Sequence, residues 1–312
     1  MKKENLIWYH FLMLAIVTVW GTTYISTSIL LEGGMDSSSE GLLPMQICTI
    51  RSLIAYVGLL CLSHKKFKAD TWKDELRFVA LGLSGVTFYF LCENTAVGIT
   101  QAANVSIIIS LAPLLTIILM SIIYKTHVPL STIMGVVIAL CGVACVVFGN
   151  GQKWGNGPSA FLGDMLAGTS ALLWAIYCVM LRNMLLKYPT LFITRKVFFY
   201  GLLSVLTIVL LNGENPLPIE ILSRPIVIGN ILYLGLIASL SCFLLYNVVL
   251  GKIGVIATNN YGYLNPVVTF IFAIIILKDP FSWLSLIGII ITLSGLWIAQ
   301  MQEFKKLRKN SI

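Results

Sequence analysis

One half of this chain repeats the other at a fixed offset. Residues 90–142 recur without a gap 153 positions later, at residues 243–295. The offset matches Leu91 with Leu244, Asn94 with Asn247, Gly98 with Gly251, Pro113 with Pro266 and Gly142 with Gly295. A duplicated chain is expected to fold into two similar units, and in membrane proteins such units often meet around a shared central site.

The composition of the chain indicates a membrane protein. Its mean hydropathy is +0.91, and 58% of its 312 residues are hydrophobic while 11% are charged. A protein surrounded by water could not bury so high a fraction of hydrophobic residues. A spanning helix takes about 20 apolar residues, and glycine, proline and charged residues divide the chain into ten such stretches. They cover residues 6–30, 42–62, 78–97, 102–124, 130–148, 160–181, 191–211, 226–250, 255–277 and 281–301.

The predicted fold class is an all-α membrane protein with ten transmembrane helices arranged as two inverted five-helix repeats. The first repeat occupies residues 1–150 and the second occupies residues 151–312. Five crossings are an odd number, so the second repeat enters the membrane from the opposite face. Weaker matches extend the repeat, since Trp20 corresponds to Trp174 at an offset of 154 and Arg51 to Arg195 at 144. Inverted halves that exchange conformations supply outward-open and inward-open states.

Basic residues predict the orientation. With the amino terminus in the cytoplasm, seventeen of the 21 Lys and Arg residues fall on the cytoplasmic side, and the positive-inside rule then places both termini there. The seventeen are Lys2, Lys3, Lys65, Lys66, Lys68, Lys73, Arg77, Lys125, Arg182, Lys187, Arg195, Lys196, Lys252, Lys305, Lys306, Arg308 and Lys309, and the other four are Arg51, Lys153, Arg224 and Lys278. We expect a multi-pass plasma-membrane protein, in a bacterium the inner membrane.

The net charge of +8 is explained by this topology. The expected partners of the basic cytoplasmic loops are the anionic headgroups of the bilayer. The basic tail lacks the aromatic or glycine interleaving of nucleic-acid binders, so no nucleic acid is expected. The chain is expected to act as a monomer or a homodimer.

Several short motifs occupy matching places in the predicted helices. They are Val19-Trp20-Gly21-Thr22 in the first, Arg51 in the second, Leu111-Ala112-Pro113 in the fourth, Leu264-Asn265-Pro266 in the ninth, and the glycines of residues 135–142 and 288–295. In this order they resemble the EamA type of the drug/metabolite transporter superfamily, over most of the chain. The resemblance implies an exporter or facilitator of small metabolites, amino acids among them. It also implies a central cavity lined by both halves, notably by the third, fourth, eighth and ninth helices.

Glu93 is a carboxylate inside the third predicted span, roughly 6 Å below its outer end at 1.5 Å per residue. An ionisable group at that depth is costly and is a functional candidate by default. With Asn94 it forms a Glu-Asn pair that resembles a signature of one branch of the family. Glu93 is a candidate for carrying a coupling proton or for contacting an amino group of the substrate. Alternatively it pairs with Arg51, which enters from the same face, and a pair that breaks and reforms would be a gate.

Spacing places a polar stripe on the ninth predicted helix and a matching one on the fourth. The stripes consist of Asn259, Tyr263 and Pro266 in the ninth helix and of Ser106, Ser110 and Pro113 in the fourth. A mid-helix proline leaves a carbonyl without its hydrogen bond, which the membrane tolerates beside protein or a wet cavity. The pattern predicts a polar cavity with Pro113 and Pro266 as hinges, although Asn and Ser also bond between helices.

Aromatic residues are the other candidates for a cavity wall. Trp20 and Trp174 lie in the middle of their predicted spans, where they suit aromatic or cationic solutes, whereas aromatics at helix ends anchor a protein at the interface. The offset of 153 matches Glu93 with Tyr246 and Ser106 with Asn259. The two halves are therefore expected to share a scaffold and to differ in the chemistry that selects a substrate.

These patterns favour a secondary-active transporter that exports small metabolites such as amino acids by alternating access, with Glu93 as the candidate proton carrier. The alternative is efflux of multiple drugs or cationic amphiphiles. An intramembrane enzyme is disfavoured because no nucleophile with a base lies at depth, and a sensor because no soluble output domain is predicted. We therefore expect a small-molecule substrate, no catalytic residues, no metal site and no cofactor.

Overall fold

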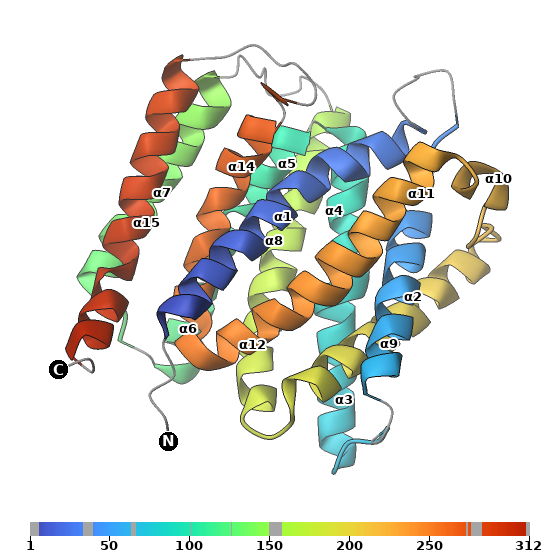
Figure 1. Cartoon of the computed structure of the whole chain (residues 1–312), viewed down its shortest axis with the longest axis horizontal. Coiled ribbons are helices and arrows are strands. Elements are labelled where there is room, and N and C mark those ends of the chain that lie inside the picture. Colours follow the sequence, from blue (N-terminus) through green and yellow to red (C-terminus); the bar gives the residue numbers. More distant parts are fainter. Residues whose placement is uncertain are drawn as a thin grey trace.

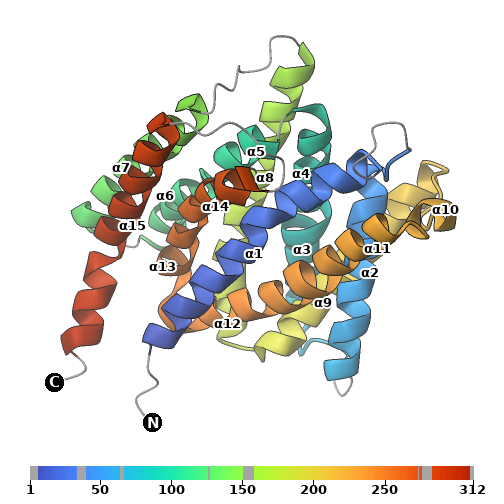
Figure 2. The same ribbon diagram turned by 45° about the horizontal axis from the view of Figure 1, so that its top comes forward.

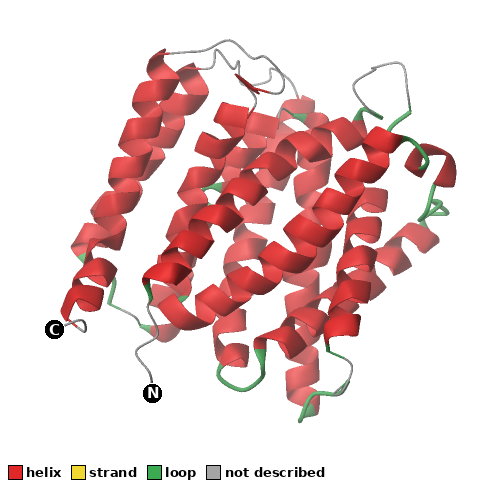
Figure 3. Ribbon diagram, viewed as in Figure 1, coloured by secondary structure: helices red, strands yellow, loops and turns green. Residues whose placement is uncertain are grey.

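The computed structural model describes residues 6–33, 40–63, 67–100, 102–125, 127–149, 158–272, 274–275 and 283–309. All regular structure in these residues is helical (Figure 3), which confirms the predicted all-α class. Lipid offers the backbone no hydrogen bonds, and a helix satisfies its own N–H and C=O groups. The elements are α1 (Ile7–Leu31), α2 (Pro44–Leu62), α3 (Trp72–Gly82), the π-helix η1 (Leu83–Thr87), α4 (Phe88–Ile99), α5 (Ala102–Ile109), α6 (Ala112–Tyr124), α7 (Leu130–Gly149), α8 (Pro158–Leu185), α9 (Thr190–Leu211), α10 (Ile219–Leu222), α11 (Pro225–Leu232), the π-helix η2 (Tyr233–Cys242), α12 (Phe243–Ile253), α13 (Val255–Asn260), the 3-10 helix η3 (Tyr261–Leu264), α14 (Asn265–Phe272) and α15 (Trp283–Lys309).

Among the described residues, seven helices are long and apolar enough to cross a membrane. They are Ile7–Leu31, Pro44–Leu62, Trp72–Ile99, Val105–Tyr124, Phe161–Leu185, Thr190–Leu211 and Pro225–Ile253, and the shorter apolar helices are Leu130–Cys145 and Leu286–Ala299. The ninth predicted span is divided into α13, η3 and α14. Its end and the beginning of the tenth lie outside the described residues, so the number of ten crossings stays a prediction.

The helices form one bundle whose edge is the pair α7 and α15 (Figures 1 and 2). α1 begins and α15 ends at the same end of the bundle, beside the connection from α8 to α9. Six basic residues of the charge count, Lys2, Lys3, Lys65, Lys66, Lys153 and Lys278, lie outside the described residues, as do the side chains of residues 302–309.

The two halves pack crosswise. α1 contacts η2, α12 and α14 of the second half, while α8 contacts η1, α4, α5 and α6 of the first. In the same sense, α2 packs against η2 and α9 packs against η1. Much of the buried surface of each half therefore lies against the other half, and the space between them is a natural place for a site.

Glycines let α7 and α15 approach closely. A Cβ added at Gly135 would lie 2.6 Å from the Gly295 carbonyl oxygen, and one added at Gly142 would lie 2.7 Å from that of Gly288. The two helices run antiparallel, because the earlier glycine of each faces the later glycine of the other. Small residues permit such contact between membrane helices.

Both halves contain a π-helical segment at the same repeat position. The offset of 153 places residues 83–87 of η1 on residues 236–240, which lie within η2. π-Helical turns are rare and are frequent at functional sites. In η2 one backbone carbonyl accepts a hydrogen bond from a cavity residue, since Trp20 Nε1 donates to the Ala238 oxygen at 3.1 Å.

Each of the two predicted hinge prolines directly follows an interruption of its predicted helix. The fourth predicted helix is interrupted at Ser110 and Leu111, and α6 begins at the next residue with Pro113 in its first turn. Pro266 likewise stands in the first turn of α14, directly after η3. A proline cannot donate to the carbonyl four residues before it, and both interruptions fall directly before a proline. The role of Pro113 and Pro266 as hinges stays a prediction.

Replacing Gly142 by alanine tests the close approach of α7 and α15. The new methyl group would collide with the backbone of α15, and overpacking of this kind costs about 1–3 kcal/mol. Gly142→Ala should lower the midpoint of thermal unfolding in detergent. Gly229→Ala is the matched control, because a Cβ at Gly229 of α11 meets nothing within 4 Å. Equal midpoints for the two variants would contradict the packing described here.

Candidate functional site

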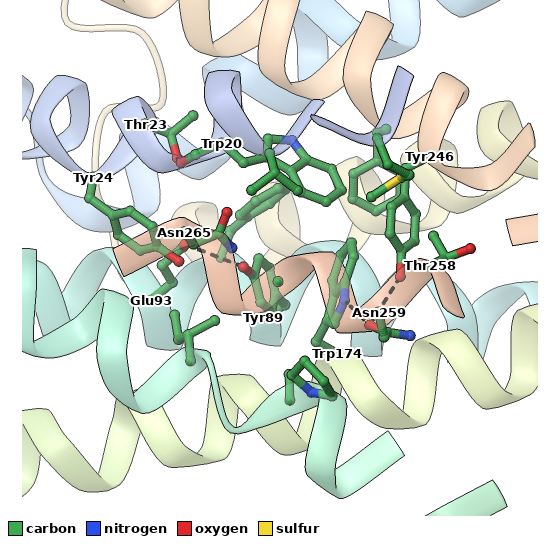
Figure 4. Close-up of a pocket in the computed structure, with 18 of the residues that line it drawn as sticks. Trp20, Thr23, Tyr24, Tyr89, Glu93, Trp174, Tyr246, Thr258, Asn259 and Asn265 are labelled. Atoms are coloured by element: carbon green, nitrogen blue, oxygen red, sulfur yellow. Dashed lines mark hydrogen bonds between the residues drawn. The ribbon is translucent and has the colours of Figure 1, made fainter. Parts of the chain in front are cut away.

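A central cavity lies between the two halves (Figure 4). It comprises about 640 Å³ of empty space, including the part open to solvent. Its walls come from α1, α2, α4, α5 and α6 of the first half and from α8, α12, α13, η3 and α14 of the second. These include the third, fourth, eighth and ninth predicted helices, as the family resemblance implies.

Glu93 supplies a carboxylate to this cavity from α4. Its side chain is 6% exposed. The Tyr89 hydroxyl, one helical turn earlier, donates to Glu93 Oε1 at 3.3 Å. Figure 4 shows the phenol rings of Tyr89 and of Tyr24 from α1 directed toward the carboxylate. A donor without a formal charge thus stabilises the carboxylate inside an apolar bundle.

Arg51 reaches the same cavity from α2 but does not pair with Glu93. Its guanidinium carbon lies 3.8 Å from the centroid of the Phe90 ring, and its Nε donates to Ser239 Oγ of η2 at 3.0 Å. Among the described residues the two side chains form no ion pair, so the alternative in which Glu93 pairs directly with Arg51 is not seen in this structure. The contact with Phe90 and the hydrogen bond to η2 hold the guanidinium in place, and Arg51 is one of the residues that line the cavity.

Asn259 is the centre of the polar wall in the second half. Its Oδ1 accepts hydrogen bonds from Trp174 Nε1 at 3.2 Å and from the Tyr246 hydroxyl at 3.1 Å. The Cys178 thiol lies 3.7 Å from the same oxygen. This one amide therefore orients two aromatic side chains that line the cavity.

Aromatic rings form the wall of the cavity where the halves meet. The repeat-matched Trp20 and Trp174 pack edge to face, with centroids 5.4 Å apart and planes at 89°. Tyr246 lies 5.1 Å from Trp20 and 5.2 Å from Trp174, and Phe243 lies 5.5 Å from Trp174. The wall offers both ring faces and ring edges to a solute.

The polar stripe of the ninth predicted helix follows a spacing of three residues. The cavity is lined by Asn259, Gly262 and Asn265, while the side chain of Tyr263 is fully buried against Ile117 and Val136. The cause is η3, because a 3-10 helix has three residues per turn and rotates position i+4 away from position i. The predicted spacing of four assumed an uninterrupted α-helix.

The other predicted residues lie beside the cavity, with the exception of Pro113, which lines it. Ser106 and Ser110 are buried, and Ser110 Oγ donates to the carbonyl of Ile107 at 2.6 Å. Asn94 is buried next to Glu93 and donates to the carbonyl of Pro44 at 3.3 Å. Pro266 is buried as well, outside the lining.

Sequence analysis missed three aromatic residues of the lining, Tyr89, Phe90 and Phe243. One signal was present, since Tyr89 stands four residues before Glu93 and therefore on the same helix face. Phe90 and Phe243 are a repeat-matched pair at the start of the duplicated segment. Nothing in their local sequence distinguishes them from lipid-facing aromatics.

A separate cluster of charges lies where α3 begins. Asp74 accepts hydrogen bonds from Lys187 and Tyr188 of the α8–α9 connection and from Arg77 at 3.0 Å. The hydrogen bond to Asp74 raises the pKa of the Lys187 ammonium group. Glu75 in turn accepts from Lys196. These contacts tie the first half to the second at the end of the bundle, away from the cavity.

Apolar helices around a cavity with buried ionisable side chains are typical of multi-pass membrane proteins. A model of the EamA-like transporter family matches residues 7–148 and again residues 161–301. The chain belongs to the EamA-like transporter family. The two matches also fit the internal duplication. Among the described residues, no group of three or more His, Cys, Asp or Glu side chains is placed to hold a metal ion.

Similar proteins carry the description of transporters. An uncharacterized transporter of Archaeoglobus fulgidus is 26% identical over 297 residues, covering 94% of this chain and 98% of that protein. The uncharacterized transporter YetK of Bacillus subtilis is 27% identical over 81% of this chain and 77% of its own length. A probable terminal-alkyne amino-acid exporter of Streptantibioticus cattleyicolor is 21% identical over 100% of this chain and 98% of its own.

One solved crystal structure has a similar fold. It superposes with a TM-score of 0.74 at 16% sequence identity and covers 94% of this chain and 96% of the other. At this identity the likeness concerns the fold alone.

Removing the Asn259 amide tests its place at the centre of the polar wall. Asn259→Ala would leave Trp174 Nε1 and the Tyr246 hydroxyl without their shared acceptor, and an unsatisfied buried donor costs about 1–3 kcal/mol. We expect a lower unfolding midpoint and a shift in tryptophan emission. Asn212→Ala, at an exposed position just after α9, is the control. If both variants unfold and fluoresce like the parent protein, this hydrogen-bond network does not exist.

Proposed function

We propose that the protein is a secondary-active transporter that exports small metabolites, amino acids among them, by alternating access between two inverted five-helix repeats. One observation carries the proposal. A carboxylate from α4 and a guanidinium from α2, both buried, face one cavity whose other wall belongs to the second half. Ionisable groups in a membrane bundle mark the path of a substrate or ion, and a site between two repeats is reachable from either face as they rock.

The packing supports an inverted relation between the repeats, over residues 1–150 and 151–312. Gly135 faces Gly295 while Gly142 faces Gly288, which is the reciprocal pairing expected of two copies related by a two-fold axis. α1 packs on the eighth and ninth predicted helices, and α8 packs on the third and fourth. Both observations fit an axis that passes between the halves and through the cavity region.

The similar exporter supports amino acids as the substrate class. The protein of Streptantibioticus cattleyicolor is named for export of a terminal-alkyne amino acid and aligns along the whole chain. An amino acid carries one positive and one negative group, and the cavity holds one carboxylate and one guanidinium.

The position of the described basic residues supports the orientation. Arg77, Lys187, Arg195 and Lys196 lie where α3 begins and where α8 meets α9, at the end of the bundle where α1 begins and α15 ends (Figure 1). By the positive-inside rule this end faces the cytoplasm of the plasma membrane. In this orientation the basic loops at this end would face the anionic lipid headgroups of the bilayer.

A second candidate function is efflux of cationic amphiphiles, which the aromatic wall favours because ring faces attract cations. Trp20, Trp174 and Tyr246 form that wall, with Glu93 as the counter-ion. Arg51 argues against it, since a guanidinium in the same cavity repels a solute whose only charge is positive.

Neutralising Glu93 tests its role as proton carrier. In proteoliposomes loaded with mixed amino acids, the parent protein should exchange labelled for unlabelled solute, and a pH gradient should drive net flux. Glu93→Gln should keep the exchange and lose the response to the pH gradient, because the glutamine cannot release a proton.

The matched control is Asp164→Asn, which removes a carboxylate from α8 outside the cavity lining. It should retain both exchange and gradient-driven flux. If Glu93→Gln retains the full response to the pH gradient, Glu93 is not the coupling acid.

A further inference from the structure

Charged side chains join the two halves at the end of the bundle where α3 begins. Asp74, in the first turn of α3, accepts hydrogen bonds from Lys187 and Tyr188, which belong to the connection from α8 to α9. The side chain of Asp74 is 1% exposed and that of Lys187 is 43% exposed. One partner of this ion pair is buried while the other still meets water, so dissolved salt can screen the pair.

The ion pair joins helices that carry the cavity wall. α3 continues through η1 into α4, which supplies Tyr89 and Glu93, and α8 supplies Trp174. The rings of Tyr89 and Trp174 lie 5.1 Å apart, centroid to centroid. The Asp74–Lys187 pair thus holds together the ends of two helices that meet again at the cavity. Those ends cannot separate unless the pair breaks.

The repeat counterpart of this contact, at the other end of the bundle, is apolar. The offset of 153 places the first residue of α3 on the first residue of α11, and Asp74 on Val227. Val227 is fully buried in an apolar cluster with Leu30 of α1 and Ile47 of α2. The same contact between the halves is therefore built from charges at one end and from apolar side chains at the other.

Hydrogen bonds at the apolar end go to neutral acceptors. Arg224, directly before α11, donates to the carbonyl oxygens of Gly33 at 3.3 Å and of Glu40 at 2.8 Å, in the connection from α1 to α2. This connection is the repeat counterpart of the one from α8 to α9. Salt weakens a pair of opposite charges and does not weaken apolar burial. The two ends of the bundle should therefore respond differently to ionic strength.

We propose that the Asp74–Lys187 pair is an ionic lock, which holds the cavity closed toward the end where α3 begins and favours the conformation open to the opposite face. The inference rests on the proposed alternating access and adds what sets the balance between the two conformations. A contact made in one conformation only shifts the equilibrium toward that conformation. In the proposed orientation the locked end faces the cytoplasm, so the ionic strength there regulates opening.

Labelling of a single cysteine placed at Met13 tests the lock. Met13 lines the cavity from α1, and the seven native cysteines are replaced so that the new thiol is the only one. Reaction with a membrane-impermeant thiol reagent is timed in everted vesicles, which expose the cytoplasmic face, and in right-side-out vesicles. Asp74→Asn should raise the rate in everted vesicles about threefold, because the closed state loses a partly exposed ion pair.

Lys187→Gln breaks the same pair from the second half and leaves the start of α3 unchanged, so it decides the test if Asp74→Asn does not fold. It should raise the rate in everted vesicles as well. Arg77→Gln is the matched control, because Arg77 pairs with the same carboxylate from within α3. It should label like the parent protein. Arg224→Gln weakens the other end and should instead raise the rate in right-side-out vesicles.

Salt distinguishes the lock from a general loosening of the bundle. A higher salt concentration outside everted vesicles should speed the labelling of the parent protein, and Asp74→Asn should have lost this response because the pair no longer exists. The lock is overturned if Asp74→Asn and Lys187→Gln both label at the parent rate in everted vesicles. A full salt response in Asp74→Asn, or an Arg77→Gln control that labels as fast as Asp74→Asn, also overturns it.

Flux in proteoliposomes keeps a failure of the lock distinct from a failure of the proposed function. A parent protein that moves solutes while its labelling ignores both substitutions is a transporter without this lock. One whose labelling follows the predictions and that moves no solute opens and closes at the locked end and lacks the transport function.

Discussion

The constraint on which this structure depends is the hydrogen-bonding demand of a backbone in lipid. It makes all regular structure in the described residues helical, and it confines each departure from the α-helix to places where another group satisfies the backbone. Several departures surround the cavity. Two of them, the break at Ser110 and Leu111 and the 3-10 helix η3, lie beside it. A third, η2, supplies hydrogen-bond acceptors to two cavity residues, the Ala238 carbonyl to Trp20 and Ser239 Oγ to Arg51. The site therefore lies where the helical pattern is interrupted.

The same constraint explains why the two halves share a scaffold and differ in chemistry. Glycine contacts, π-helical segments and helix breaks recur at matched positions, because they determine how helices approach and bend. The cavity wall repeats two aromatic pairs, Trp20 with Trp174 and Phe90 with Phe243, but its charged side chains have no charged counterpart in the lining. Glu93 is matched by Tyr246, and Arg51 by an arginine that lies at the end of the bundle. A symmetric frame can thus exchange conformations while an asymmetric lining binds an asymmetric solute.

Much of this was readable in the sequence. Hydropathy located the helices, the duplication located the interface between halves, and charge at depth identified Glu93 and Arg51, which the cavity contains together with Trp20, Trp174 and Asn259. The predictions that were wrong depended on local helix geometry. Tyr263 and Pro266 were expected in the lining because spacing was counted on a continuous α-helix, and η3 changes that count. The direct Arg51–Glu93 pair was one alternative, based on similar depth, and depth does not reveal that Arg51 contacts Phe90 and Ser239 instead. π-Helices have no composition that marks them, so their recurrence was visible in the structure only.

The central claim is that the cavity opens alternately to the two faces of the membrane. A single cysteine at Thr23, a small residue of the lining, tests it most directly when the seven native cysteines have been replaced. The Thr23→Cys protein is treated with a membrane-impermeant thiol reagent in right-side-out and in everted vesicles. The account predicts labelling from both faces. Labelling from one face only, under every condition, would contradict it.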